Sequence, residues 1–150
     1  MTADDFDAVF TRERLPMVRL AYLMLREEVH AEEVVQDAFV SVLERWERLD
    51  NPGAYLRRCV VNGCLSQMRR ARRGVPAPLR RTEDDLATDH TLDAVRRLSP
   101  QRQAIVVLRY YADMTQDEIA DTLRLPVGTV KSGLHRALAD LKEALRDGVA

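Results

Sequence analysis

Apolar residues recur at steps of three and four along most of this chain, a spacing that places them on one face of an α-helix. Over the first 25 residues the predicted buried stripe is Phe6, Phe10, Leu15, Val18, Ala21, Tyr22 and Leu25. A second helix is predicted over 31–46, with an inner face of Val34, Val35, Ala38, Phe39, Val42, Leu43 and Trp46. A third is predicted from about Gly53 to Arg73, opened by Pro52.

The segment 114–145 predicts two short helices joined by a tight turn. Thr115 and Glu118 have the spacing of a capping box at the start of the first helix. Pro126 cannot continue that helix but suits the start of another, so we expect a break near Arg124 and a restart from about Val127. One narrow face of the second helix is apolar and should pack inward: Val130, Leu134, Ala137 and Leu141. This is the layout of a DNA-reading helix-turn-helix.

The opposite face of the second helix carries short hydrogen-bonding groups and long cations, with no carboxylate before Asp140. Such a face can approach both phosphates and base edges, and its residues are Gly128, Thr129, Lys131, Ser132, His135 and Arg136. Any amphipathic helix has a polar outer face, so that face alone does not decide the matter. The capped helix and the proline break before it favour DNA binding.

Charge is distributed unevenly along the chain, although the net charge is only −1. Residues 1–50 contain six arginines and twelve acids, whereas residues 51–81 contain eight arginines and no acid. The acidic part suits a protein partner, and the basic run suits a phosphate backbone. Alternatively, some of these arginines, particularly Arg57 or Arg58, are solvated or pair with acids of the first two helices.

Residues 74–90 contain two prolines and no apolar periodicity, which is typical of a linker. We therefore predict an all-α protein of two small helical domains, 1–73 and 91–150, joined by a flexible linker. Each half can bury a core of three or four helices. Relative motion of the two domains is expected.

Catalytic and metal-binding patterns are not evident in this sequence. Cys59 and Cys64 have no second pair for a metal site, and the three histidines are scattered, so we expect no metal, cofactor or enzymatic activity. The cysteines are interpreted as small buried hydrophobic residues. The sequence shows neither a signal peptide nor an apolar stretch long enough to span a membrane. A soluble cytoplasmic protein is expected.

Motifs in both halves resemble the extracytoplasmic-function sigma factors of bacterial RNA polymerase. The words L-S-P-Q-R-Q-A-I-V-V-L-R-Y-Y (98–111) and V-G-T-V-K-S-G-L-H-R-A (127–137) are similar to region 4. Three segments resemble region 2, namely A-E-E-V-V-Q-D-A-F-V, N-P-G-A-Y-L-R-R-C-V-V-N and R-R-A-R-R. Within the second, A-Y-L-R-R-C-V-V-N resembles the SigE-type actinobacterial branch. Two positions depart from region 4: Gly133 replaces a usual arginine, and Arg124 a frequent turn glycine. We expect Gly133 to weaken the helix and to remove a phosphate contact.

The resemblance implies a set of roles for individual residues. The helix 31–46 would dock on the clamp coiled coil of the polymerase β′ subunit through Gln36 and Asp37, with Glu33 and Arg45 as neighbours. The loop 48–53, with Asp50 and Asn51, would capture a flipped base of the −10 motif. Asn62 would lie near the separated strand, whose phosphates would be contacted by Arg57, Arg58, Arg69, Arg70, Arg72 and Arg73.

The resemblance also implies partners for each half. The second domain would read the −35 element and contact the β flap, and an anti-sigma factor is a possible further partner. Two alternatives stay open at this stage. One is a stand-alone helix-turn-helix regulator, and the other is a sigma-like decoy in which Gly133 and Arg124 mark decayed DNA reading. Run-off transcription with core polymerase separates the three hypotheses: initiation indicates a sigma factor, repression a stand-alone regulator, and no effect a decoy.

Overall fold

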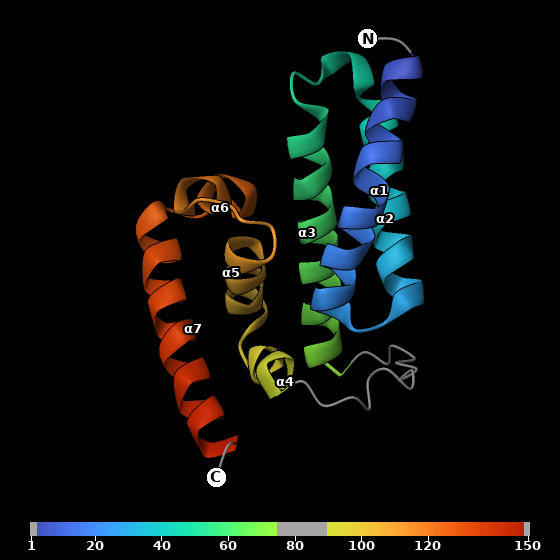
Figure 1. Ribbon diagram of the computed structural model, residues 1–150. Coiled ribbons are helices and arrows are strands. Elements are labelled where there is room, and N and C mark those ends of the chain that lie inside the picture. The colour runs from blue at the N-terminus through green and yellow to red at the C-terminus, as the bar shows by residue number, and fades with distance from the viewer. Residues whose placement is uncertain (1–2, 75–89, 149–150) are drawn as a thin grey trace. The chain divides into compact units, whose positions relative to one another are not determined.

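The computed structural model describes residues 3–74 and 90–148, and every regular element in these ranges is helical. The elements are α1 (Ala3–Leu25), α2 (Glu28–Glu44), the 3₁₀ helix η1 (Trp46–Arg48), α3 (Pro52–Arg72), α4 (His90–Arg96), α5 (Pro100–Tyr110), α6 (Gln116–Leu123) and α7 (Val127–Gly148) (Figure 1). The chain divides into two compact units, Met1–Ala77 and Pro78–Ala150. The predicted all-α fold with two small helical domains is confirmed. Of the predicted linker, residues 75–89 lie outside the described residues, and His90 opens α4.

The first unit is a bundle in which α1, α2 and α3 each pack against the other two (Figure 1). Its centre consists of fully buried apolar side chains, among them Leu20, Val42, Leu56, Val60, Val61 and Cys64. Burying a side chain of this size stabilises the fold by about 1.5–3 kcal/mol. The predicted inner face of α2 is buried, with one error: Leu43 is 57% exposed.

The stripe predicted for α1 is only partly right, although the helix itself is where the sequence placed it: Ala21 is buried, and Phe6, Val18, Tyr22 and Leu25 are half-buried. The buried side chains are Val9, Met17, Leu20, Ala21 and Met24, whereas Phe10 and Leu15 are exposed. Apolar residues cover more than one face of α1, and only the face against α2 and α3 is buried. Phe10 instead lies at the edge of the bundle, with its ring centroid 4.8 Å from that of Phe39.

The helix α2 begins three residues before the predicted start because Glu27 caps it. The Glu27 carboxylate is buried and accepts hydrogen bonds from the backbone N–H groups of Val29 and His30, at 3.0 and 2.7 Å. The Nδ1 atom of His30 lies 3.0 Å from the same carboxylate. A carboxylate at this position satisfies two of the helix's unpaired N–H groups and complements its dipole.

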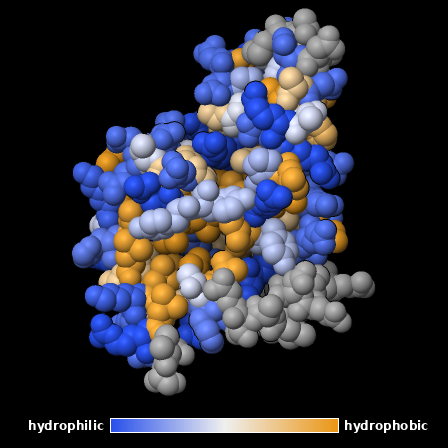
Figure 2. All heavy atoms as spheres, in the orientation of Figure 1, coloured by the Kyte–Doolittle hydropathy of each residue, from blue (hydrophilic) through white to orange (hydrophobic). Residues whose placement is uncertain are grey.

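The second unit is built around α7, which packs against α4, α5 and α6. The predicted inward face of α7 is confirmed, since Val130, Leu134, Ala137 and Leu141 are all buried. They meet the fully buried Ile105, Leu108 and Ile119 in one small core. Figure 2 shows apolar atoms gathered along α7 and bordered by hydrophilic residues. This core fixes which face of α7 is left to solvent.

Candidate nucleic-acid and polymerase interfaces

The helices α6 and α7 form the predicted helix-turn-helix. Thr115 and Glu118 make both bonds of the capping box: the Thr115 N–H donates to Glu118 Oε1 at 3.0 Å, and the Glu118 N–H donates to Thr115 Oγ1 at 3.1 Å. At the other end of α6, Arg124 has the left-handed conformation, with φ of 56°. The Leu125 N–H then donates to the Ala120 carbonyl at 2.9 Å, as in a Schellman motif. The chain is thereby turned sharply into α7.

The six residues predicted to read DNA lie on the outer side of α7. Five are exposed, namely Gly128, Lys131, Ser132, His135 and Arg136, and Thr129 is half-buried. The Ser132 hydroxyl donates to the Thr129 carbonyl at 3.2 Å, so it retains its oxygen as an acceptor. A Cβ on Gly128 would meet nothing within 4 Å, which leaves the start of α7 open to a close approach. The arrangement suits contact with both phosphates and bases.

Gly133 lies at the border between this outer surface and α5. It is half-buried, and a Cβ built on it would come 2.9 Å from Ile105 Cδ1. The position therefore faces α5. The lack of a side chain permits close packing of α5 on α7.

The loop predicted to capture a base lies between η1 and α3. Asp50 and Asn51 are both exposed. Asn51, however, is the N-cap of α3, and its side-chain oxygen accepts a hydrogen bond from the Ala54 N–H at 3.1 Å. Its amide N–H groups are the donors left for a ligand. The side chain thus has a structural role that the sequence analysis did not assign.

The arginines predicted to hold the separated strand lie at the other end of α3. Arg69, Arg70, Arg72 and Arg73 are exposed. A helix of the 21 residues of α3 is roughly 30 Å long. The loop and these arginines therefore lie at opposite ends of α3, too far apart to meet at one site. Asn62 is exposed and lies on one face of α3 with Arg69 and Arg73, at helical steps of seven and four.

Arg57 and Arg58 differ from the arginines at the end of α3, because both are only half-exposed. The Nε atoms of both side chains are shielded from solvent. Their stems therefore contribute to packing within the bundle, whereas the alternative stated above expected them to be solvated or paired with acids of the first two helices. They are weaker candidates for DNA contact than the exposed arginines.

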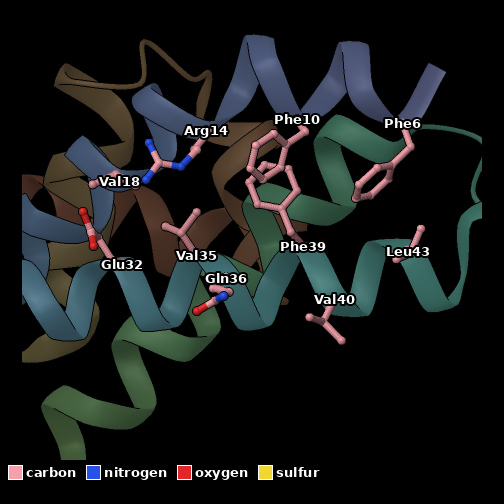
Figure 3. Close-up of a pocket in the computed structure, with 10 residues that line it drawn as sticks. All are labelled: Phe6, Phe10, Arg14, Val18, Glu32, Val35, Gln36, Phe39, Val40 and Leu43. Carbon is pink, nitrogen blue, oxygen red and sulfur yellow. The ribbon is translucent and has the colours of Figure 1, made fainter. Parts of the chain in front are cut away.

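An apolar groove of about 370 Å³ runs between α1 and α2 (Figure 3). The rings of Phe10 and Phe39 lie against each other within it, and Gln36 lies on its α2 wall (Figure 3). Next to them, Val40 and Leu43 are 50% and 57% exposed. Exposed apolar side chains beside a polar residue are typical of a protein-binding surface. Gln36 was predicted from the sequence, whereas Val40 was not, and Leu43 was expected in the core.

The other residues predicted to bind polymerase point to different sides of α2. Glu33 and Asp37 are exposed, and Asp37 lines a smaller hollow that also contains Cys59 and Gly63 of α3. Arg45 is the C-cap of α2, and its guanidinium carbon lies 5.9 Å from the ring centroid of Tyr55. The residues predicted to bind polymerase are therefore spread over different sides of α2 and do not form a single cluster.

Two groups in the first unit have raised pKa values. Burial raises the pKa of the Cys64 thiol to about 12, so the thiol is protonated at neutral pH. Desolvation, followed by a hydrogen bond with Cys59, raises the pKa of Tyr55. Both cysteines are free.

Within residues 3–74 and 90–148, no three metal-ligating side chains are grouped, and no helix there could cross a membrane.

Known families match both units. Residues 9–74 match the family described as "Sigma-70 region 2", and residues 91–141 match "Sigma-70, region 4". The RNA polymerase sigma-E factor of Streptomyces coelicolor is 31% identical over 153 residues, covering 94% of this chain and 86% of the relative. The ECF RNA polymerase sigma factor SigM of Mycobacterium tuberculosis is 36% identical over 154 residues, with 93% and 76% covered. The chain belongs to the extracytoplasmic-function sigma factors.

A solved structure gives the same fold. The sigma factor RpoE of Bartonella quintana, in complex with the anti-sigma factor NepR, matches with a TM-score of 0.76 at 21% identity. The match covers 96% of this chain and 98% of that one. As a sigma factor, the protein directs RNA polymerase to promoters for transcription initiation. The stand-alone regulator and the decoy are thereby set aside.

Proposed function

We propose that the two units of this sigma factor divide promoter recognition between them. The first unit binds the polymerase core and holds the opened −10 strand, and the second reads the −35 duplex. The observation that supports this best is the exposed outer face of α7, which follows a fully capped helix and a sharp turn. The synthesis of RNA belongs to the polymerase, and the sigma factor contributes no catalytic group.

For the −35 element, α7 enters the major groove with its first turns. Lys131 and Arg136 contact phosphates or guanine edges, and Ser132 and His135 offer shorter polar groups to neighbouring bases. Gly128 and Thr129 lie at the start of α7, where the backbone can approach the DNA closely. The polymerase β flap is the further partner of this unit.

For the −10 element, Asp50 and the amide of Asn51 hold an unstacked base at the start of α3. Asn62 and Arg69 follow along one face of that helix, and Arg70, Arg72 and Arg73 supply further cations at its end. Exposed cations that track a strand bind its phosphates without regard to sequence. Base selection therefore belongs to the loop, and strand guidance belongs to the arginines.

For the polymerase core, we assign the exposed face of α2 to the β′ clamp helices. Gln36 and Asp37 provide polar contacts, Glu33 and Arg45 lie at the rim, and the exposed Val40 and Leu43 add apolar area. An anti-sigma factor is a further proposed partner, because RpoE of Bartonella quintana was solved with one. Because a sigma factor acts with RNA polymerase on chromosomal promoters, we infer that the protein is cytoplasmic.

Each unit offers a small contact area, so neither binds its element tightly alone. Attachment of both to one polymerase raises their effective concentration at the promoter and makes the two weak contacts act together. We expect the isolated chain to bind a promoter duplex poorly in a gel shift at physiological salt. The reconstituted holoenzyme should bind the same duplex tightly. Tight, specific binding by the isolated chain would contradict this division.

A further inference from the structure

A polar hollow of about 480 Å³ lies where the start of α5 meets α7. Its lining combines residues of the proposed DNA-reading face with residues outside the helix-turn-helix: Ser99, Gln101, Arg102, Thr129, Ser132, Gly133 and Arg136. Two of these side chains are cationic and none is acidic. The reading face of α7 therefore continues without interruption onto the segment that begins α5.

Gly133 keeps this hollow open. Because the residue has no side chain, this part of the lining is the backbone of α7 itself. A Cβ at this position would also press on Ile105, 2.9 Å from its Cδ1 atom. The same glycine that permits packing of α5 on α7 thus leaves room for a ligand beside Ser132 and Arg136.

Arg102 is held at the hollow by an ion pair with α7. Its Nη1 atom lies 3.5 Å from Oδ2 of Asp140, and the two side chains are 32% and 55% exposed. This is a long, partly solvated contact with one carboxylate oxygen. A guanidinium has five N–H donors, so the pair leaves Arg102 capacity to bind a second anion.

The charge of this surface changes sign at Asp140. The next hollow along α7 is lined by three acids and one cation, namely Asp140, Glu143 and Asp147 with Arg97, together with Ala144. A phosphate backbone is attracted to the side of Arg102 and Arg136 and repelled beyond Asp140. The path of the DNA along α7 should therefore end at the Arg102–Asp140 pair.

We propose that this hollow holds one backbone phosphate of the −35 duplex between Arg102 and Arg136, and that Asp140 competes with the phosphate for Arg102. The inference rests on the proposed function, in which α7 enters the major groove. It makes Arg102 a DNA-binding residue outside the helix-turn-helix. It makes Asp140 a residue that limits affinity for DNA without touching it.

The test measures binding of the reconstituted holoenzyme to a fluorescent promoter duplex at several salt concentrations. Arg102→Ala should weaken binding about fivefold and reduce the slope of log K against log salt by about 1, the value for one lost phosphate contact. Arg102→Lys should retain part of that slope. Asp140→Asn should strengthen binding severalfold, and this gain should disappear in the Arg102→Ala background.

Two variants of the acidic hollow are matched controls, because they make the same charge changes on the same unit. Arg97→Ala and Glu143→Gln should leave the salt slope unchanged. On a template that lacks the −35 duplex, all variants should bind equally. Circular dichroism and core-polymerase binding establish that each variant is folded.

The outcomes distinguish this inference from the function on which it rests. If Arg102→Ala leaves the slope unchanged while Lys131→Ala weakens binding, the hollow holds no phosphate and the reading face of α7 stands. If Asp140→Asn keeps its gain without Arg102, the effect is general repulsion and the competition is refuted. If Lys131→Ala also has no effect, the proposed function itself fails.

Discussion

Gly63 of α3 packs against Val34 of α2, and a Cβ on Gly63 would lie only 2.9 Å from Val34 Cγ1. The branched side chain of Val34 is buried and stiff at χ1, so it cannot easily move aside. The glycine thus sets the spacing of the two helices that carry the proposed polymerase and −10 contacts. The same spacing brings Asp37 and Cys59 to one hollow.

Gly63→Ala should therefore destabilise the first unit, by about 1 kcal/mol after the gain in helix propensity is subtracted from the cost of overpacking. Urea unfolding followed by the fluorescence of Trp46 measures this, because Trp46 is the single tryptophan of the chain and is buried in that unit. Gly53→Ala is the matched control, since its Cβ would meet only Asn51 Oδ1 at 3.7 Å. A control variant less stable than Gly63→Ala would refute the packing argument.

Arg124→Gly should stabilise the second unit. Arg124 has φ of 56°, a conformation that costs a residue with a Cβ about 1–2 kcal/mol and costs glycine much less. After the larger backbone entropy of glycine is subtracted, a gain of about 0.5–1 kcal/mol remains. Native-state hydrogen exchange of amides in α6 and α7 measures it. Arg124→Ala should give no such gain, and an equal gain from alanine would assign the effect to the lost arginine side chain.

The two cysteines should differ sharply in reactivity. The thiolate is the reactive form, and a pKa of about 12 leaves Cys64 with about a thousandfold less thiolate than a thiol of pKa 9. At pH 8, iodoacetamide should modify the half-buried Cys59 and spare Cys64 until the unit unfolds. Mass spectrometry of the digested protein gives the two rates. Comparable rates in the folded protein would contradict the buried position of Cys64.

The same pKa has a consequence for stability. Because the folded state raises the pKa of Cys64 above its ordinary value of 9.0, the folded state retains a proton that the unfolded state loses. The contribution of Cys64 is fully present below pH 9 and declines as the pH rises toward 12. Stability of Cys64→Ala, measured by Trp46 fluorescence, should fall less steeply over that range. An unchanged slope would exclude Cys64 as the titrating group.

Periodicity and local rules predicted much of this fold from the sequence. The inward face of α7 and the capping box of α6 depend on residues close in the chain, so short-range physics determined them. The stripe of α1 was misread because apolar residues cover several of its faces. The early start of α2 was missed because Glu27 is not a common N-cap residue.

The candidate sites were predictable only where a motif carried them. The exposed residues of α7 could be predicted from the helix-turn-helix motif. The contact of Gly133 with Ile105 could not, because it depends on how α5 packs against α7. Arg102 lies outside the helix-turn-helix, and its pairing with Asp140 is a tertiary contact. The sequence predicted α3 almost to its full length, so the distance between Asn51 and the terminal arginines followed from it, but the N-cap role of Asn51 did not.

Run-off transcription tests the central claim, that separate units read separate promoter elements, most directly. Core polymerase with the wild-type chain is first used to recover active promoters from a genomic library, and one promoter is then prepared with its −35 element intact or scrambled. Lys131→Ala combined with Arg136→Ala should abolish transcription that depends on the −35 element, while a pull-down shows unchanged core binding. Loss of core binding in this double variant, or full activity on the intact promoter, would contradict the account.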